Sequence, residues 1–149
     1  ELLNEQGEVR AGFFTPPLPG ERERAQEAFS AQILGEIAVS KGKIAEEIQY
    51  FRKVLELVSP RGSVFSTVLS PRLFLVANES LAKACEQRGE YEKSIEAYRA
   101  IIDHRSLLVT TPASGRIWLR AVRSIIPLPE EHGRPEDAEK YRGLLPTPG

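Results

Sequence analysis

Methionine is absent from this chain, and cysteine and tryptophan each occur once among its 149 residues. A single cysteine excludes an internal disulfide framework and a cysteine-based metal cluster. The two histidines, His104 and His132, lie too far apart in the chain to form a metal motif. We therefore expect no metal and no other cofactor. Because position 1 also lacks methionine, we expect the chain to be a mature form or part of a longer protein.

Neither charge sign dominates, since 20 basic residues face 21 acidic ones. This balance predicts no general attraction to nucleic acid or to an acidic membrane surface. No apolar run reaches the roughly 20 residues that a membrane-spanning helix needs. No signal peptide is visible, and a cytoplasmic location is favoured. The hydrophobic share of 41% is typical of a folded soluble protein.

Residues 78–103 predict two amphipathic helices joined at a glycine. Before the joint, Leu81, Ala82 and Cys85 form one apolar stripe at helical spacing. After it, apolar residues recur at positions 91, 95, 98 and 102. Gly89 lies between the two stripes, where a chain leaving a helix tolerates left-handed geometry. The pattern predicts an antiparallel helical hairpin.

The same pattern occurs upstream in residues 31–58, at a constant offset of 47 positions that is seen between Gly42 and Gly89. Small residues stand at equivalent positions in the first helices, as Gly35 and Ala82. Large aromatic residues stand at equivalent positions in the second helices, as Phe51 and Tyr98. We expect the small residues to let the helices approach closely and the aromatic rings to fill the groove opposite.

These paired hairpins resemble the tetratricopeptide repeat, a helix–turn–helix unit of about 34 residues. Leu34-Gly35 and Leu81-Ala82 stand at the Leu-Gly step of that family, and Phe51 and Tyr98 at its late aromatic position. The departures are Glu47 and Ser94, where the family prefers alanine, and Asn78, where it has tryptophan. The resemblance implies an all-α, right-handed solenoid of about three hairpins, over residues 21–58, 73–103 and 114–145. The chain also resembles the C-terminal repeat arrays of bacterial multidomain signalling proteins.

The remaining segments are predicted to flank or connect these hairpins. Residues 1–20 contain several prolines and are predicted to be an entry segment or linker, and residues 146–149 a disordered tail. Residues 59–72 form an insertion whose conformation the sequence leaves open. In the third unit we expect a helix over 114–126 that ends at Pro127 and Pro129, an acidic loop over 130–134, and a last helix from Pro135.

No catalytic constellation is evident, and we expect a protein that is not an enzyme. A hydrolase based on His104 and Asp103 is an alternative, but it needs a nucleophile in the same pocket and none is apparent. Cys85 lies on an apolar helix stripe, where a buried structural thiol is expected. Trp118 is expected to belong to the core rather than to a ligand site.

A protein–protein interaction module is the favoured function, because the family resemblance implies a concave groove lined by the first helix of each unit. Gln32, Glu36, Glu79 and Lys83 are expected to face outward into that groove. Two of these four are acidic, which argues against a clamp for acidic chaperone tails. The alternative is a structural element that mediates self-association through the first helix and the neighbouring Phe13-Phe14.

A basic stripe on the predicted fifth helix is a second candidate contact, formed by Arg116, Arg120 and Arg123. Three arginines on one face suit an acidic peptide, because guanidinium groups bind carboxylates through paired hydrogen bonds. The alternative is a solvated outer face that forms ion pairs with glutamates of the last helix, such as Glu136 and Glu139.

Overall fold

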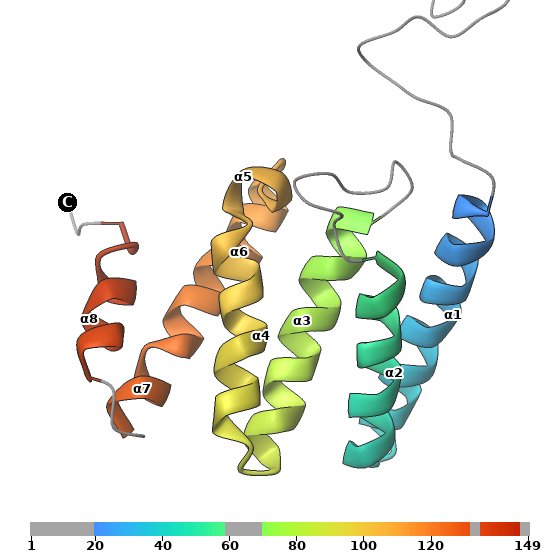
Figure 1. Cartoon of the computed structure of the whole chain (residues 1–149), viewed down its shortest axis with the longest axis horizontal. Helices are drawn as coiled ribbons and strands as arrows, with labels where there is room; N and C mark the ends of the chain where they lie inside the picture. The colour runs from blue at the N-terminus through green and yellow to red at the C-terminus, as the bar shows by residue number, and fades with distance from the viewer. Residues whose placement is uncertain (1–19, 59–69, 132–134, 147–149) are drawn as a thin grey trace, which may run out of the picture.

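The computed structural model describes residues 20–58, 70–131 and 135–146. The helices are α1 (Glu21–Ser40), α2 (Ile44–Val58), α3 (Ser70–Gln87), α4 (Tyr91–Asp103), α5 (Arg105–Leu108), α6 (Pro112–Ile125), α7 (Pro127–Glu131) and α8 (Pro135–Arg142). No strand occurs in these ranges, so the prediction of an all-α chain is confirmed for them. The helices lie side by side in a row from α1 to α8 (Figure 1).

The turns that end α1 and α3 have the same geometry. Gly42 and Gly89 are both left-handed, with φ of 69° and 74°. The amide of Lys43 donates to the carbonyl of Ala38 at 3.0 Å, and the amide that follows Gly89 donates to the carbonyl of Cys85 at 2.9 Å. This is the Schellman motif, in which a left-handed glycine satisfies the last carbonyls of a helix. The predicted hairpin turns at both glycines are therefore confirmed.

Close contact between α1 and α2 depends on the absence of a side chain at Gly35. A Cβ atom added at this position would lie 2.6 Å from Cε1 of Phe51, far inside van der Waals contact. Phe51 is fully buried, so its ring has no room to move aside. The expected pairing of a small residue with a large aromatic one is confirmed in the first hairpin.

The second hairpin is held by two polar contacts between α3 and α4, one buried and one partly buried. The hydroxyl of Ser94 donates to the carbonyl of Ala82 at 2.9 Å. The hydroxyl of Tyr98 donates to Oε2 of Glu86 at 2.7 Å. Burial, together with this carboxylate, raises the pKa of Tyr98. The phenol therefore stays protonated and keeps its hydrogen bond across the neutral pH range.

Glu47 occupies in α2 the position that Ser94 occupies in α4, and its side chain is buried. Burial raises the pKa of this carboxyl group, because water no longer stabilises the charged form. A raised pKa in the folded state means that this group favours folding at acid pH. The contribution is lost as the pH rises above the ordinary glutamate value of about 4.3.

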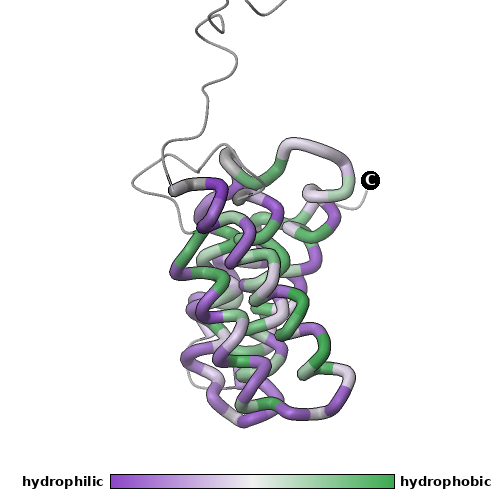
Figure 2. The backbone as a smooth tube through the Cα atoms, turned by 90° about the vertical axis from the view of Figure 1, so that its right-hand side faces the viewer, coloured by the Kyte–Doolittle hydropathy of each residue, from purple (hydrophilic) through white to green (hydrophobic). Residues whose placement is uncertain are grey.

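From α1 to α3, each helix packs mainly on its neighbours in the chain. α2 lies between α1 and α3, α4 contacts both α3 and α6, and α6 packs on α8. Contacts also join α1 to α3 and α3 to α6. Cys85 and Trp118 are buried, as predicted. Seen from the α1 end, apolar and polar segments alternate along the helices, as amphipathic helices require (Figure 2).

The structure differs from the predicted boundaries in the connections. α3 begins at Ser70, three residues before the expected start, so the end of the insertion extends this helix. A four-residue helix, α5, lies within the connection expected after position 103. The expected proline stop after α6 is instead the start of α7, which includes part of the predicted acidic loop. Proline is compatible with the first turn of a helix, where its missing N–H would be unpaired anyway.

Leu34 and Leu81 occupy equivalent positions but differ in environment. Leu34 is 43% exposed, whereas Leu81 is 8% exposed. The reason is position in the row: α3 is flanked by α2 and α4, while α1 contacts only α2 and α3 among the described helices. The periodicity therefore places Gly35 and Ala38 correctly on the buried side of α1, but Leu34 is not buried with them.

Replacing Gly35 with alanine should destabilise the fold by about 1–2 kcal/mol, because overpacking outweighs the gain in helix propensity. Urea unfolding followed by circular dichroism measures this cost. In a Phe51→Leu background the cost of Gly35→Ala should shrink, because the smaller side chain leaves room for the new methyl group. A cost that is the same in both backgrounds would contradict the proposed contact.

Candidate functional site

A groove between α1 and α3 contains two of the predicted binding residues. Its cavity of about 230 Å³ is lined by Phe29, Gln32 and Glu36 from α1. The α3 side is formed by Arg72, Leu73 and Val76. The groove thus combines apolar surface, one amide and one charge of each sign.

Gln32 is the most unusual side chain in this groove. It is only 3% exposed, although we expected it to face outward. Its Nε2 donates to Oε2 of Glu36 at 2.9 Å. Its Oε1 is buried and accepts no hydrogen bond from the residues that the structure describes. An unsatisfied buried carbonyl oxygen is costly, so an N–H donor entering the groove would gain more here than at an exposed amide.

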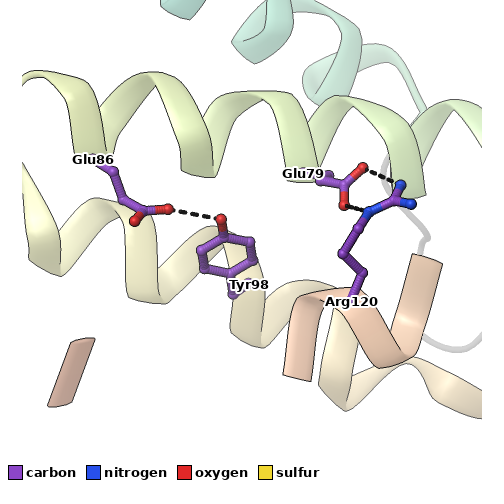
Figure 3. A network of polar contacts seen from close by, with 4 residues as sticks. All are labelled: Glu79, Glu86, Tyr98 and Arg120. Carbon is purple, nitrogen blue, oxygen red and sulfur yellow. Dashed lines mark hydrogen bonds and ion pairs between the residues drawn. The ribbon is translucent and has the colours of Figure 1, made fainter. Parts of the chain in front are cut away.

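A bidentate ion pair between Glu79 and Arg120 joins α3 to α6 (Figure 3). Nε of Arg120 lies 2.6 Å from Oε2 of Glu79, and its Nη2 lies 2.8 Å from Oε1. The Glu79 side chain is 10% exposed and that of Arg120 is 52% exposed. The hydrogen bonds to Glu79 raise the pKa of Arg120. These two predicted binding residues therefore bind each other.

This pair differs from the ion pairs predicted for the basic stripe. The alternative interpretation of the stripe named glutamates of the last helix as the partners, but Glu139 pairs with Arg142 of its own helix at 2.8 Å. The partner of Arg120 lies 41 residues earlier in the chain. A position so distant cannot be found from helical periodicity, which relates residues of one helix only.

The other predicted binding residues lie apart from the groove and from this pair. Lys83 on α3 and Arg123 on α6 are exposed. Arg116 is exposed and lines a different cavity, together with Arg105 and Trp118. Arg105 was not among the predicted binding residues, although it lines this cavity, because it lies in a segment expected to be an irregular connection. The structure therefore separates the three arginines of the stripe into different environments.

His104 has a structural environment. Its Nδ1 lies 2.8 Å from the carbonyl oxygen of Ala100, and its ring meets Phe74 edge to face at 5.5 Å. The neighbouring Asp103 is exposed. His132, the other histidine considered above, lies outside the described residues. These contacts support a packing role for His104.

Among the described residues, no group of three or more histidine, cysteine, aspartate or glutamate side chains could hold a metal ion. In the same ranges, no helix is both long enough and apolar enough to cross a membrane. No protein-family model matches this chain, and no curated protein or solved structure matches it significantly.

Replacing Arg120 with alanine should lower the free energy of unfolding by about 1–2 kcal/mol, because the nearly buried Glu79 carboxylate loses its partner. Arg120→Lys should recover only part of this loss, since lysine lacks the planar fork. A double-mutant cycle with Glu79→Gln, measured by urea unfolding, gives the coupling between the two residues. The control Arg123→Ala, on the same helix, should change stability by less than about 0.5 kcal/mol. A coupling near zero would refute this prediction.

Proposed function

We propose that this chain is a non-enzymatic interaction module that binds an extended peptide in the groove between α1 and α3. The observation that supports it most directly is the buried, unpaired Oε1 of Gln32 in the groove wall. A peptide backbone offers regularly spaced N–H donors, one of which would satisfy this oxygen. The buried amide then contributes to recognition rather than to stability.

The groove chemistry also suggests which side chains the peptide carries. Phe29 and Val76 offer apolar surface for one hydrophobic side chain. Glu36 is exposed and suits a basic group, while Arg72 on the opposite helix suits an acidic one. Opposite charges on the two walls would set the direction in which the peptide lies.

The resemblance to tetratricopeptide repeats supports the same proposal. The matching turns at Gly42 and Gly89 and the contacts of α3 with both α1 and α6 suit a short right-handed solenoid. In such solenoids the first helices of successive units line a shared binding surface. A role within a larger bacterial signalling protein belongs to this proposal and is supported by the sequence resemblance alone.

Selection of peptides from a random phage-displayed library tests the groove. The selected peptides should bind Gln32→Leu at least about tenfold more weakly, because leucine preserves most of the volume but removes the acceptor. Fluorescence anisotropy with the synthesised peptides measures the difference. Lys83→Ala, an exposed change on α3, should leave the affinity unchanged. Peptides that bind wild type and Gln32→Leu equally well would place the binding surface elsewhere.

Self-association is the second candidate function, and the exposed face of α1 favours it. Phe29, Ile33 and Ile37 follow one another at four-residue spacing and are each more than 40% exposed, as is Leu34. The position equivalent to Ile37 in α3 is Ala84, which is buried. A contiguous apolar face of this kind is typical of an interaction surface, and a second copy of the chain would cover it.

Sedimentation equilibrium at micromolar concentration separates the two candidates. If α1 mediates self-association, wild type should sediment as a dimer and Ile33→Glu as a monomer, because a charge would be buried in the interface. Val39→Glu is the matched control, since Val39 is equally exposed on α1 but lies off the apolar face. A wild-type protein that remains monomeric would remove this candidate.

A further inference from the structure

A second cavity, of about 540 Å³, lies at the other end of the helix row. It is bounded by α5, by the first half of α6 and by the segment after α8. Its walls include Val109, Leu119 and Leu144, and its polar groups include Arg105 and Arg116. The volume falls within the range of about 300–1,000 Å³ that is usual for ligand sites.

Trp118 positions one of the two arginines. The guanidinium carbon of Arg105 lies 4.8 Å from the centroid of the Trp118 ring. The ring is itself held in place, because it is buried and its Nε1 donates to the carbonyl of Ile102 at 3.4 Å. A cation that stacks on a fixed indole is oriented before any ligand arrives, and the edge of the guanidinium keeps its N–H donors.

The charge in this cavity is of one sign. Arg105 and Arg116 line it, and among the lining residues that the structure describes there is no aspartate or glutamate. Arg120 lies one turn further along α6, and its charge is neutralised by Glu79. Neighbouring arginines of one helix therefore differ in whether an acidic side chain of the described residues pairs with them. Two guanidinium groups beside aliphatic walls are complementary to a ligand that carries carboxylate and apolar groups together.

We propose that this cavity binds an acidic peptide segment in which a carboxylate side chain pairs with Arg105 and Arg116 while an adjacent leucine or phenylalanine packs on the apolar wall. The planar fork of arginine matches a carboxylate, and the peptide supplies the apolar group at a fixed distance from the charge. The site is separate from the groove between α1 and α3 and does not depend on it.

Trp118 provides a direct readout, because it is the only tryptophan in the chain. The probe is the blocked peptide acetyl-Asp-Leu-Glu-Phe-amide, which contains no tryptophan. Its titration should change the tryptophan emission in a saturable way, and the affinity should fall as salt is added. The neutral analogue acetyl-Asn-Leu-Gln-Phe-amide should bind at least about tenfold more weakly.

Two variants on the same helix test the assignment. Arg116→Ala should weaken binding of the acidic peptide at least about tenfold, with an unchanged circular dichroism spectrum. Arg123→Ala removes another exposed arginine of α6, one that does not line the cavity, and should leave the affinity unchanged. Gln32→Leu should also have no effect, which keeps this test independent of the α1–α3 groove.

Three outcomes would overturn the proposal. The neutral peptide could bind as tightly as the acidic one, which would leave the arginines without a role. Arg123→Ala could weaken binding as much as Arg116→Ala, which would indicate general attraction to positive charge. Inorganic phosphate alone, at the same concentration, could displace the peptide, which would indicate a simple anion site with no apolar recognition.

Discussion

The spacing between the two helices of each hairpin is the constraint on which the rest of this structure depends. In the first hairpin, the Phe51 ring packs on the bare backbone of Gly35, so the backbone of α1 itself forms one wall of the core. In the second, the Ser94 hydroxyl reaches the carbonyl of Ala82, which requires a similarly close approach. α1 and α3, the first helices of these two hairpins, form the groove, and the Glu79–Arg120 ion pair joins α3 to α6.

The polar groups of the candidate sites fall into three environments, which differ in the partners that each group has. Glu79 and Arg120 compensate each other, so they stabilise the junction between α3 and α6 and offer little to a partner. Gln32 is buried with an unused acceptor, which suits recognition of a backbone. Arg116 and Arg105 line one cavity, and no aspartate or glutamate is among the described residues that line it, which suits recognition of a carboxylate. Similar side chains thus suit different roles because their surroundings differ.

The sequence predicted most of what depends on local periodicity. The helical class, the glycine turns and the burial of Cys85 and Trp118 follow from apolar spacing and from backbone preferences, and the structure agrees with them. The features that the sequence did not predict depend on contacts between distant segments. The pairing of Glu79 with Arg120 and the burial of Gln32 are determined by how whole helices pack, which a stripe on one helix does not specify.

The packing of helices in chain order also bears on how the protein folds. Because α1 contacts only α2 and α3 among the described helices, and α2 lies between them, the loops closed during folding are short. Proteins rich in such local contacts have low contact order and fold quickly, because little chain entropy is lost before contacts form. The same arrangement allows α1 to detach without disturbing the helices beyond α3. Amide hydrogen exchange is therefore expected to be faster in α1 than in α3 and α4, so that among these helices opening begins at the one that carries the exposed apolar face.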